Sequence, residues 1–250
     1  LSYNSNDMAE CIDALTKLLE IDVNHPDGID LLVRALVKTD DEPKALEILN
    51  RLTGIGKLNE KMFLQHARLL YRNEQWGSAM LLFKEIYDTY DSDVGADGFT
   101  SSLIRLERWQ DALDILTVMW NKGRFSTTRA NRVVNMLYKM KRYDELLEFV
   151  NDLDEPYSSD HYVLKASARA LMNVGKYDIA LEWWKLLIEE NSTILEYHLG
   201  AARCSYWLDE LDFALNHVDV IIDMDSGNIE ALAIKAQICT RREEWDEALL

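Results

Sequence analysis

Residues 177–187 read YDIALEWWKLL, and the pattern at the start of this stretch decides the fold. An aromatic residue, Tyr177, precedes Ala180 by three positions, and apolar residues follow the alanine at +1, +4 and +7. These spacings place the apolar side chains on one face of an α-helix. The small alanine lets a neighbouring helix approach closely. The stretch therefore predicts a helix that packs through this face.

The same pattern recurs along the whole chain at a nearly constant interval. We call the position equivalent to Ala180 the register position. It falls at residues 11, 45, 79, 112, 146, 180, 214 and 248, so the intervals are 34 residues apart from one of 33. A second set of mostly small residues lies twelve positions before it: Val33, Ala67, Thr100, Val134, Ala168, Ala202 and Ala236. A fixed period of this length predicts stacked repeats, and the two sets indicate two helices in each repeat.

These residues resemble the tetratricopeptide repeat (TPR) along essentially the entire chain. The resemblance implies an all-α fold in which antiparallel helix pairs stack into a right-handed superhelical solenoid. The first helix of each pair would then line a concave groove. The predicted segments are 1–25, holding the second helix of an incomplete repeat; the repeats 26–59, 60–92, 93–126, 127–160, 161–194 and 195–228; and 229–250, a truncated repeat.

Repeat 93–126 departs from the pattern. Its register interval is one residue short, and Gly95 and Gly98 stand where its first helix should begin. An interior glycine costs a helix roughly 1 kcal/mol relative to alanine. We therefore expect this first helix to be shortened and to begin near Phe99 or Thr100.

The charge, cysteines and apolar runs of the chain argue against several functional classes. The chain has 27 Lys and Arg against 44 Asp and Glu, a net charge of −17. This charge argues against nucleic acid or anionic lipid as the partner of the whole surface. Three cysteines without a C-x-x-C pair indicate a reducing, cytoplasmic compartment. No apolar run approaches the roughly 20 residues of a membrane span. The chain begins without Met and ends inside a predicted helix, so we expect a piece of a longer protein, and targeting segments can lie outside it.

No motif predicts chemistry within these residues. The five histidines show no i, i+4 pairing with one another or with a cysteine, so the sequence predicts no metal site. No nucleophile motif or phosphate-binding loop is present, and no cofactor is expected. We therefore predict that this part of the protein is not an enzyme.

The resemblance also implies which side chains face the groove. They lie 18, 15, 11, 8 and 7 positions before the register, and this rule selects 35 positions in seven first helices. These positions hold eleven basic and five acidic residues, so the predicted groove carries +6 on an acidic chain. The candidate partner-binding residues are Arg34, Lys61, Arg68, Tyr71, Arg72, Arg105, Asn131, Asn135, Tyr138, Lys139, Lys165, Arg169, Asn173, Arg203, Tyr206, Trp207, Gln237 and Arg241.

Two explanations compete for these residues. The cations seven positions before the register end the first helix, where the helix dipole stabilises them by roughly 0.3–1 kcal/mol. The position eleven before the register lies in mid-helix and holds hydrogen-bond donors and no acid: Arg34, Arg68, Ser101, Asn135, Arg169, Arg203 and Gln237. Arginine matches carboxylates and phosphates with two parallel bonds. These side chains either bind a ligand or form salt bridges between neighbouring helices, and the sequence leaves both open.

The sequence therefore predicts a non-enzymatic scaffold that binds an extended, acidic protein segment in the groove. The resemblance allows an alternative, in which the repeats recruit substrate for a larger enzyme such as a glycosyltransferase. An anionic polysaccharide would then occupy the groove. Single-stranded RNA is a third hypothesis, which the net charge disfavours. The exposed ends of a solenoid can also stack, so end-to-end self-association is expected in a truncated chain.

Overall fold

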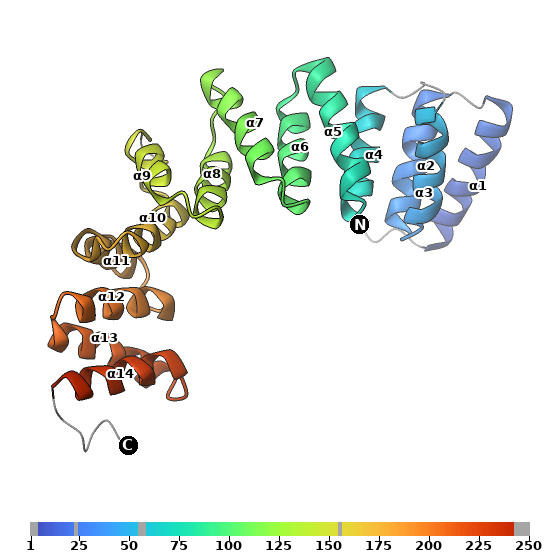
Figure 1. Cartoon of the computed structure of the whole chain (residues 1–250). Coiled ribbons are helices and arrows are strands. Elements are labelled where there is room, and N and C mark those ends of the chain that lie inside the picture. Colours follow the sequence, from blue (N-terminus) through green and yellow to red (C-terminus); the bar gives the residue numbers. More distant parts are fainter. Residues whose placement is uncertain (1–4, 23–24, 55–58, 155–156, 243–250) are drawn as a thin grey trace. The chain divides into compact units, whose positions relative to one another are not determined.

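The structure is a computed structural model that describes residues 5–22, 25–54, 59–154 and 157–242, where the only regular elements are α-helices (Figure 1). It forms two compact units, unit 1 (residues 1–124) and unit 2 (residues 125–250). Unit 1 contains α1 (Ser5–Ile21), α2 (Pro26–Lys38), α3 (Glu42–Gly54), α4 (Glu60–Arg72), α5 (Trp76–Tyr90), α6 (Asp93–Arg105) and α7 (Trp109–Asn121). Unit 2 contains α8 (Thr127–Lys139), α9 (Tyr143–Asn151), α10 (His161–Asn173), α11 (Tyr177–Glu190), α12 (Leu195–Trp207), α13 (Leu211–Met224) and α14 (Ile229–Arg241).

Within each unit the helices pack in the order of the sequence. Every helix contacts the next one, and first helices also contact the first helix that follows, as α4 contacts α6 and α10 contacts α12. Each helix lies within one predicted repeat segment. The predicted all-α solenoid of consecutively packed helices is confirmed.

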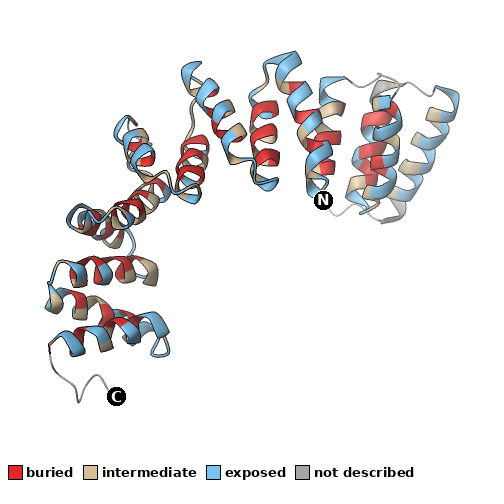
Figure 2. Cartoon of the chain, in the orientation of Figure 1, coloured by how far each residue is buried: buried red, intermediate tan, exposed pale blue. Residues whose placement is uncertain are grey.

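The register positions form the centre of the core (Figure 2). The side chains at residues 45, 79, 112, 146, 180 and 214 are completely buried. Cys11, the first register residue, is exposed instead, because no described helix precedes α1. Small side chains at these positions let the backbones approach, while the bulkier residues at +4 and +7 fill the space between helices.

The expected shortening of the first helix in repeat 93–126 is wrong. Helix α6 begins at Asp93 and has 13 residues, with the Ser92 side chain capping its N-terminus. The glycines serve the packing of α6 on α5. A Cβ at Gly98 would lie 2.3 Å from the Phe83 ring, and one at Gly95 would lie 2.8 Å from the backbone nitrogen of Tyr87. Close helix contact thus outweighs the low helix propensity of glycine.

This contact predicts opposite effects for two glycine substitutions. Gly98→Ala should lower the free energy of unfolding by about 1–3 kcal/mol, because the new methyl group overpacks the interface. Gly77→Ala on α5 is the matched control, because its Cβ would meet open space. It should leave stability unchanged or raise it by up to about 1 kcal/mol. Urea unfolding followed by circular dichroism measures both, and equal shifts of the two midpoints would contradict this account of α6.

Candidate functional site

In unit 1 the predicted groove positions line a pocket between the first helices α2 and α4. Its volume is ≈ 290 Å³, and it is lined by Val33, Arg34, Val37, Lys38, Gln65, Arg68, Leu69 and Arg72. Val33 and Leu69 are buried, whereas the four cations are exposed. The lining of the pocket therefore combines apolar side chains with four cationic ones. Three predicted site residues, Arg34, Arg68 and Arg72, meet here.

Most of the cations in this region contact an acid of the same unit. Asp30 pairs with Arg34, accepts a hydrogen bond from Lys61 Nζ at 2.8 Å, and accepts another from Gln65 Nε2 at 2.8 Å. Burial alone would raise the pKa of Asp30, but these hydrogen bonds and the charge of Arg34 hold it below its ordinary value.

The other two arginines of the pocket differ. Arg72 Nη2 lies 2.7 Å from Glu42 Oε1. Arg68 is exposed and has no hydrogen bond or ion pair within the described ranges.

The Asp30 cluster predicts a pH-dependent loss of stability. Because the folded pKa of Asp30 lies below its ordinary value of 3.8, its ion pairs stabilise the fold above that pH and are lost as the pH falls through and below it. Asp30→Asn should therefore cost about 1–3 kcal/mol at neutral pH and progressively less in acid. Thermal unfolding at several pH values measures this difference.

The control is Asp13→Asn, which breaks an exposed pair with Lys17 on α1. An exposed ion pair contributes about 0–1 kcal/mol, so little change is expected. A difference between Asp30→Asn and the wild type that stayed constant with pH would contradict the role of the Asp30 charge.

In unit 2 the groove positions line a larger pocket of ≈ 610 Å³. Its lining consists of Tyr138, Arg169, Met172, Asn173, Trp184, Glu196, Leu199, Gly200, Arg203 and Glu230. Arg169 pairs with Glu196, and Arg203 Nη2 lies 3.0 Å from Glu230 Oε2. Lys165 Nζ lies 3.7 Å from Glu196. In unit 2 the two arginines eleven positions before the register, Arg169 and Arg203, thus each pair with a glutamate at the start of the next first helix. These pairs are the salt bridges that the sequence left open.

The predicted cations at the ends of first helices also contact neighbouring repeats. Arg105 Nε lies 3.4 Å from Tyr71 Oη, and its guanidinium lies 5.4 Å from the Trp76 ring. In unit 2 Arg241 lies 5.0 Å from the Tyr206 ring and donates to the Tyr206 carbonyl at 2.9 Å. These contacts give Tyr71, Tyr206 and the two arginines a structural role.

The remaining predicted site residues differ from one another in their contacts and exposure. The buried Oδ1 of Asn131 has no hydrogen-bond partner within the part of the chain that is described. Asn173 Nδ2 donates to the Arg169 carbonyl at 2.8 Å. Trp207 is 60% exposed and stacks on Tyr177 at 5.7 Å. The ring of Tyr138 lies 5.6 Å from that of Tyr143, while Asn135, Lys139 and Gln237 are exposed.

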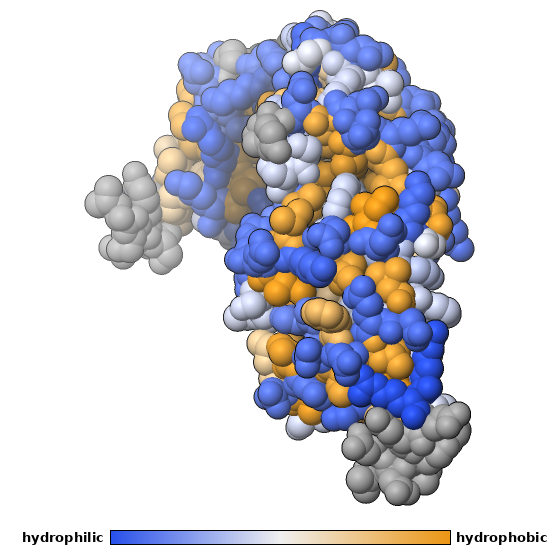
Figure 3. Space-filling view, turned by 90° about the vertical axis from the view of Figure 1, so that its left-hand side faces the viewer, coloured by the Kyte–Doolittle hydropathy of each residue, from blue (hydrophilic) through white to orange (hydrophobic). Residues whose placement is uncertain are grey.

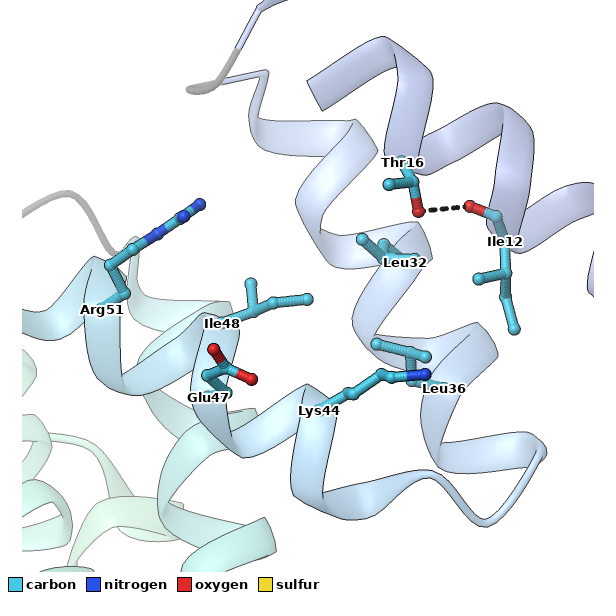
Figure 4. A pocket seen from close by; sticks show the side chains of 8 residues that line it. All are labelled: Ile12, Thr16, Leu32, Leu36, Lys44, Glu47, Ile48 and Arg51. Carbon is cyan, nitrogen blue, oxygen red and sulfur yellow. Dashed lines mark hydrogen bonds between the residues drawn. The ribbon is translucent and has the colours of Figure 1, made fainter. Parts of the chain in front are cut away.

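Sequence reasoning missed a second pocket in unit 1, of ≈ 370 Å³ between α1, α2 and α3. Figure 4 shows Leu32 and Ile48 pointing into it, while Lys44 and Arg51 lie on α3 at its edge. The apolar residue Ile48, three positions after the register and only half-buried, is the signal that could have revealed it.

A histidine pair in unit 2 also escaped the sequence analysis, because its members are 19 residues apart. His198 Nδ1 and His217 Nδ1 lie 3.1 Å apart, and His198 Nε2 donates to the Ser192 carbonyl at 3.1 Å. In a neutral His198 ring whose Nε2 donates, Nδ1 is the acceptor of the hydrogen bond that His217 Nδ1 donates.

The described residues include histidines, cysteines and acids, which are the side chains that ligate metals in proteins. No group of three metal-ligating side chains occurs among them. Burial raises the pKa of the Cys204 thiol to about 12, which leaves it inert. No helix in the described ranges has the length and apolarity of a membrane span.

Comparison with known proteins shows the fold. No protein-family model and no curated protein matches the sequence. Among solved structures, YrrB, described as a TPR protein with an unusual peptide-binding site, has a TM-score of 0.63 at 16% identity, over 75% of this chain and 97% of its own. The C-terminal part of a TPR protein from Cytophaga hutchinsonii has a TM-score of 0.72 at 14% identity, over 86% and 90%. The chain has the tetratricopeptide-repeat fold.

A third similar structure is a double mutant of MamA RS-1, with a TM-score of 0.62 at 15% identity over 68% of this chain and 96% of that chain. These likenesses confirm the resemblance at the level of the TPR fold. The pockets of the two units therefore lie on the first helices of TPR-type helix pairs.

Proposed function

We propose that this TPR chain is a non-enzymatic scaffold that holds an extended, acidic segment of a partner protein along its first helices. The observation that carries the proposal is the pocket of α2 and α4, in which four cations surround apolar walls. Arg68 supports it most directly, because its guanidinium has no partner in the described part of unit 1. An acidic side chain with apolar neighbours fits this combination.

The ion pairs of the other groove arginines are compatible with ligand binding. The side chains of Arg169 and Arg203 are 43% and 48% exposed, so their pairs with glutamate contribute little to stability. A partner carboxylate can replace Glu196 or Glu230 at small cost. The description of YrrB favours a peptide over a polysaccharide as the occupant.

Removing the Arg68 charge should weaken binding of an acidic peptide. Arg68→Ala is expected to raise the Kd about tenfold, the loss expected for one charge-assisted contact. The control is Arg51→Ala, which removes the same charge from the edge of the other unit 1 pocket. Fluorescence anisotropy measures the Kd of each variant at two salt concentrations. The labelled ligands are a peptide of alternating Glu and Leu, an anionic polysaccharide and poly(U).

The results distinguish the three ligand classes. The proposal requires binding of the acidic peptide, weakened by Arg68→Ala and unchanged by Arg51→Ala. Preferential binding of the polysaccharide would support substrate recruitment for a larger enzyme instead. A loss in Arg51→Ala alone would move the site to the pocket between α1, α2 and α3.

The glutamates of unit 2 predict a gain of binding. Glu196→Gln should release Arg169 and Lys165 and lower the Kd for the acidic peptide by about threefold to tenfold. Glu182→Gln on α11 removes an equal charge from a pair outside the groove and serves as the control. Equal effects of the two substitutions would show that net charge, and not the groove, governs the binding.

A further inference from the structure

Apolar side chains reach the surface in several places, and Figure 3 shows groups of them among hydrophilic side chains on one side of the chain. Two second helices of unit 2 carry them at the same positions relative to the register. Ile179 and Leu186 on α11 are 43% and 52% exposed, and Phe213 and Val220 on α13 are 61% and 38% exposed. A spacing of seven residues is two helical turns, so each pair forms a line along its helix. We call these four residues the outer stripe.

The outer stripe is not a requirement of the fold. The equivalent residues on four other second helices are Lys44 and Arg51 on α3, Ser78 and Glu85 on α5, Asp111 and Val118 on α7, and Glu145 on α9 with Asp152 directly after its end. Seven of these eight residues are polar, yet all four helices form and pack. A core role therefore does not explain the apolar residues of α11 and α13. Exposed apolar side chains that the fold does not require are typical of an interaction site.

The two lines of the outer stripe lie on second helices that share a neighbouring helix. Helices α11 and α13 both pack against α12. His217 lies on α13 between Phe213 and Val220, and its hydrogen bond to His198 anchors it to α12. Burial lowers the pKa of His217, and electrostatic interactions with His198 and with Lys185 on α11 lower it further.

The helices that carry the outer stripe are strongly acidic. Together α11 and α13 contain seven Asp and Glu and one Lys, a net charge of −6. Three of these acids are paired, Glu182 with Lys185, Asp212 with Arg242 and Asp219 with Lys235. The other four form no ion pair in the described ranges and are exposed: Asp178, Glu189, Glu190 and Asp223. An apolar surface with unpaired acids beside it is complementary to apolar side chains flanked by cations.

We propose that the outer stripe docks an amphipathic helix of a partner protein, with apolar residues on one face and Lys or Arg beside them. A helix with apolar residues every three or four positions can insert its ridge between the lines on α11 and α13. The acidic surroundings repel an anionic membrane surface. They also repel a second copy of this chain, whose net charge is −17. The groove lies on the first helices, so this surface is independent of the groove proposed above.

The test uses a synthetic peptide of leucine and lysine whose leucines recur at helical spacing. A scrambled peptide of the same composition has no apolar face, and a third peptide carries glutamate in place of lysine. Binding to the whole chain is measured by fluorescence anisotropy. The variant Leu186→Ser/Phe213→Ser removes the centre of the stripe, and Leu81→Ser, at a 62% exposed leucine of α5, is the matched control. Circular dichroism verifies that each variant is folded.

The expected result is binding of the helical basic peptide at least about tenfold tighter than the scrambled one. The double variant should lose this advantage, while Leu81→Ser keeps it and both variants still bind the acidic groove peptide. Equal binding of the scrambled peptide, or an equal loss in Leu81→Ser, would overturn the proposal. Preferential binding of the glutamate peptide would do the same. Stripe-dependent binding to anionic vesicles, or a dimer in sedimentation velocity that the double variant abolishes, would replace the partner helix with a membrane or a second copy.

Discussion

The architecture depends on the close approach of a first helix to the second helix that precedes it. Where α6 meets α5 and α12 meets α11, only a glycine fits: a Cβ at Gly98 or at Gly200 would lie 2.3 Å from the ring of Phe83 or Trp184. Elsewhere an alanine at the register position is completely buried against its neighbour, as Ala45 and Ala214 are. This contact fixes the distance between successive helices. As a result, side chains at a fixed offset from the register align from one first helix to the next within a unit.

This alignment explains why the sequence predicted the fold well, and why side chains chosen by their offset from the register lie near one another. The period of the small and apolar residues is set by local helix geometry and by the nearest contacts, and both leave a trace in a single sequence. Residues chosen by offset, such as Arg34 and Arg68 or Arg169 and Arg203, line the same pocket. Gly95 and Gly98 misled the prediction, because helix propensity is a local preference and the contact with α5 is not local.

The partners of the groove cations could not be predicted in the same way. Arg169 meets Glu196 and Lys61 meets Asp30 across 27 and 31 residues, and such pairing depends on side-chain reach between two helices. The groove cations are paired with acids differently in the two units. In unit 1 the buried Asp30 pairs with two cations, Arg34 and Lys61. In unit 2 exposed glutamates pair with the arginines and line the pocket with them. A buried acid orients its cations and leaves them accessible. An exposed acid that lines the pocket competes directly with a ligand for the cations. We therefore expect unit 1 to be the better preorganised of the two proposed sites for an acidic partner.

The charge of the chain is distributed unequally between the groove positions of the first helices and the rest of the chain. Eleven of the 27 basic residues lie at groove positions, whereas five of the 44 acids do. The excess of acids therefore lies elsewhere on the chain. On α11 and α13 that excess surrounds apolar side chains. A surface charge of one sign discourages association with any partner of that sign, and it steers the approach of the opposite one. If both proposed surfaces bind, unit 2 would hold an acidic segment on its first helices and a basic helix on its second helices. Two partners of opposite charge would otherwise pair with each other. Their separation on different helices would let the scaffold keep both apart while holding them on one unit.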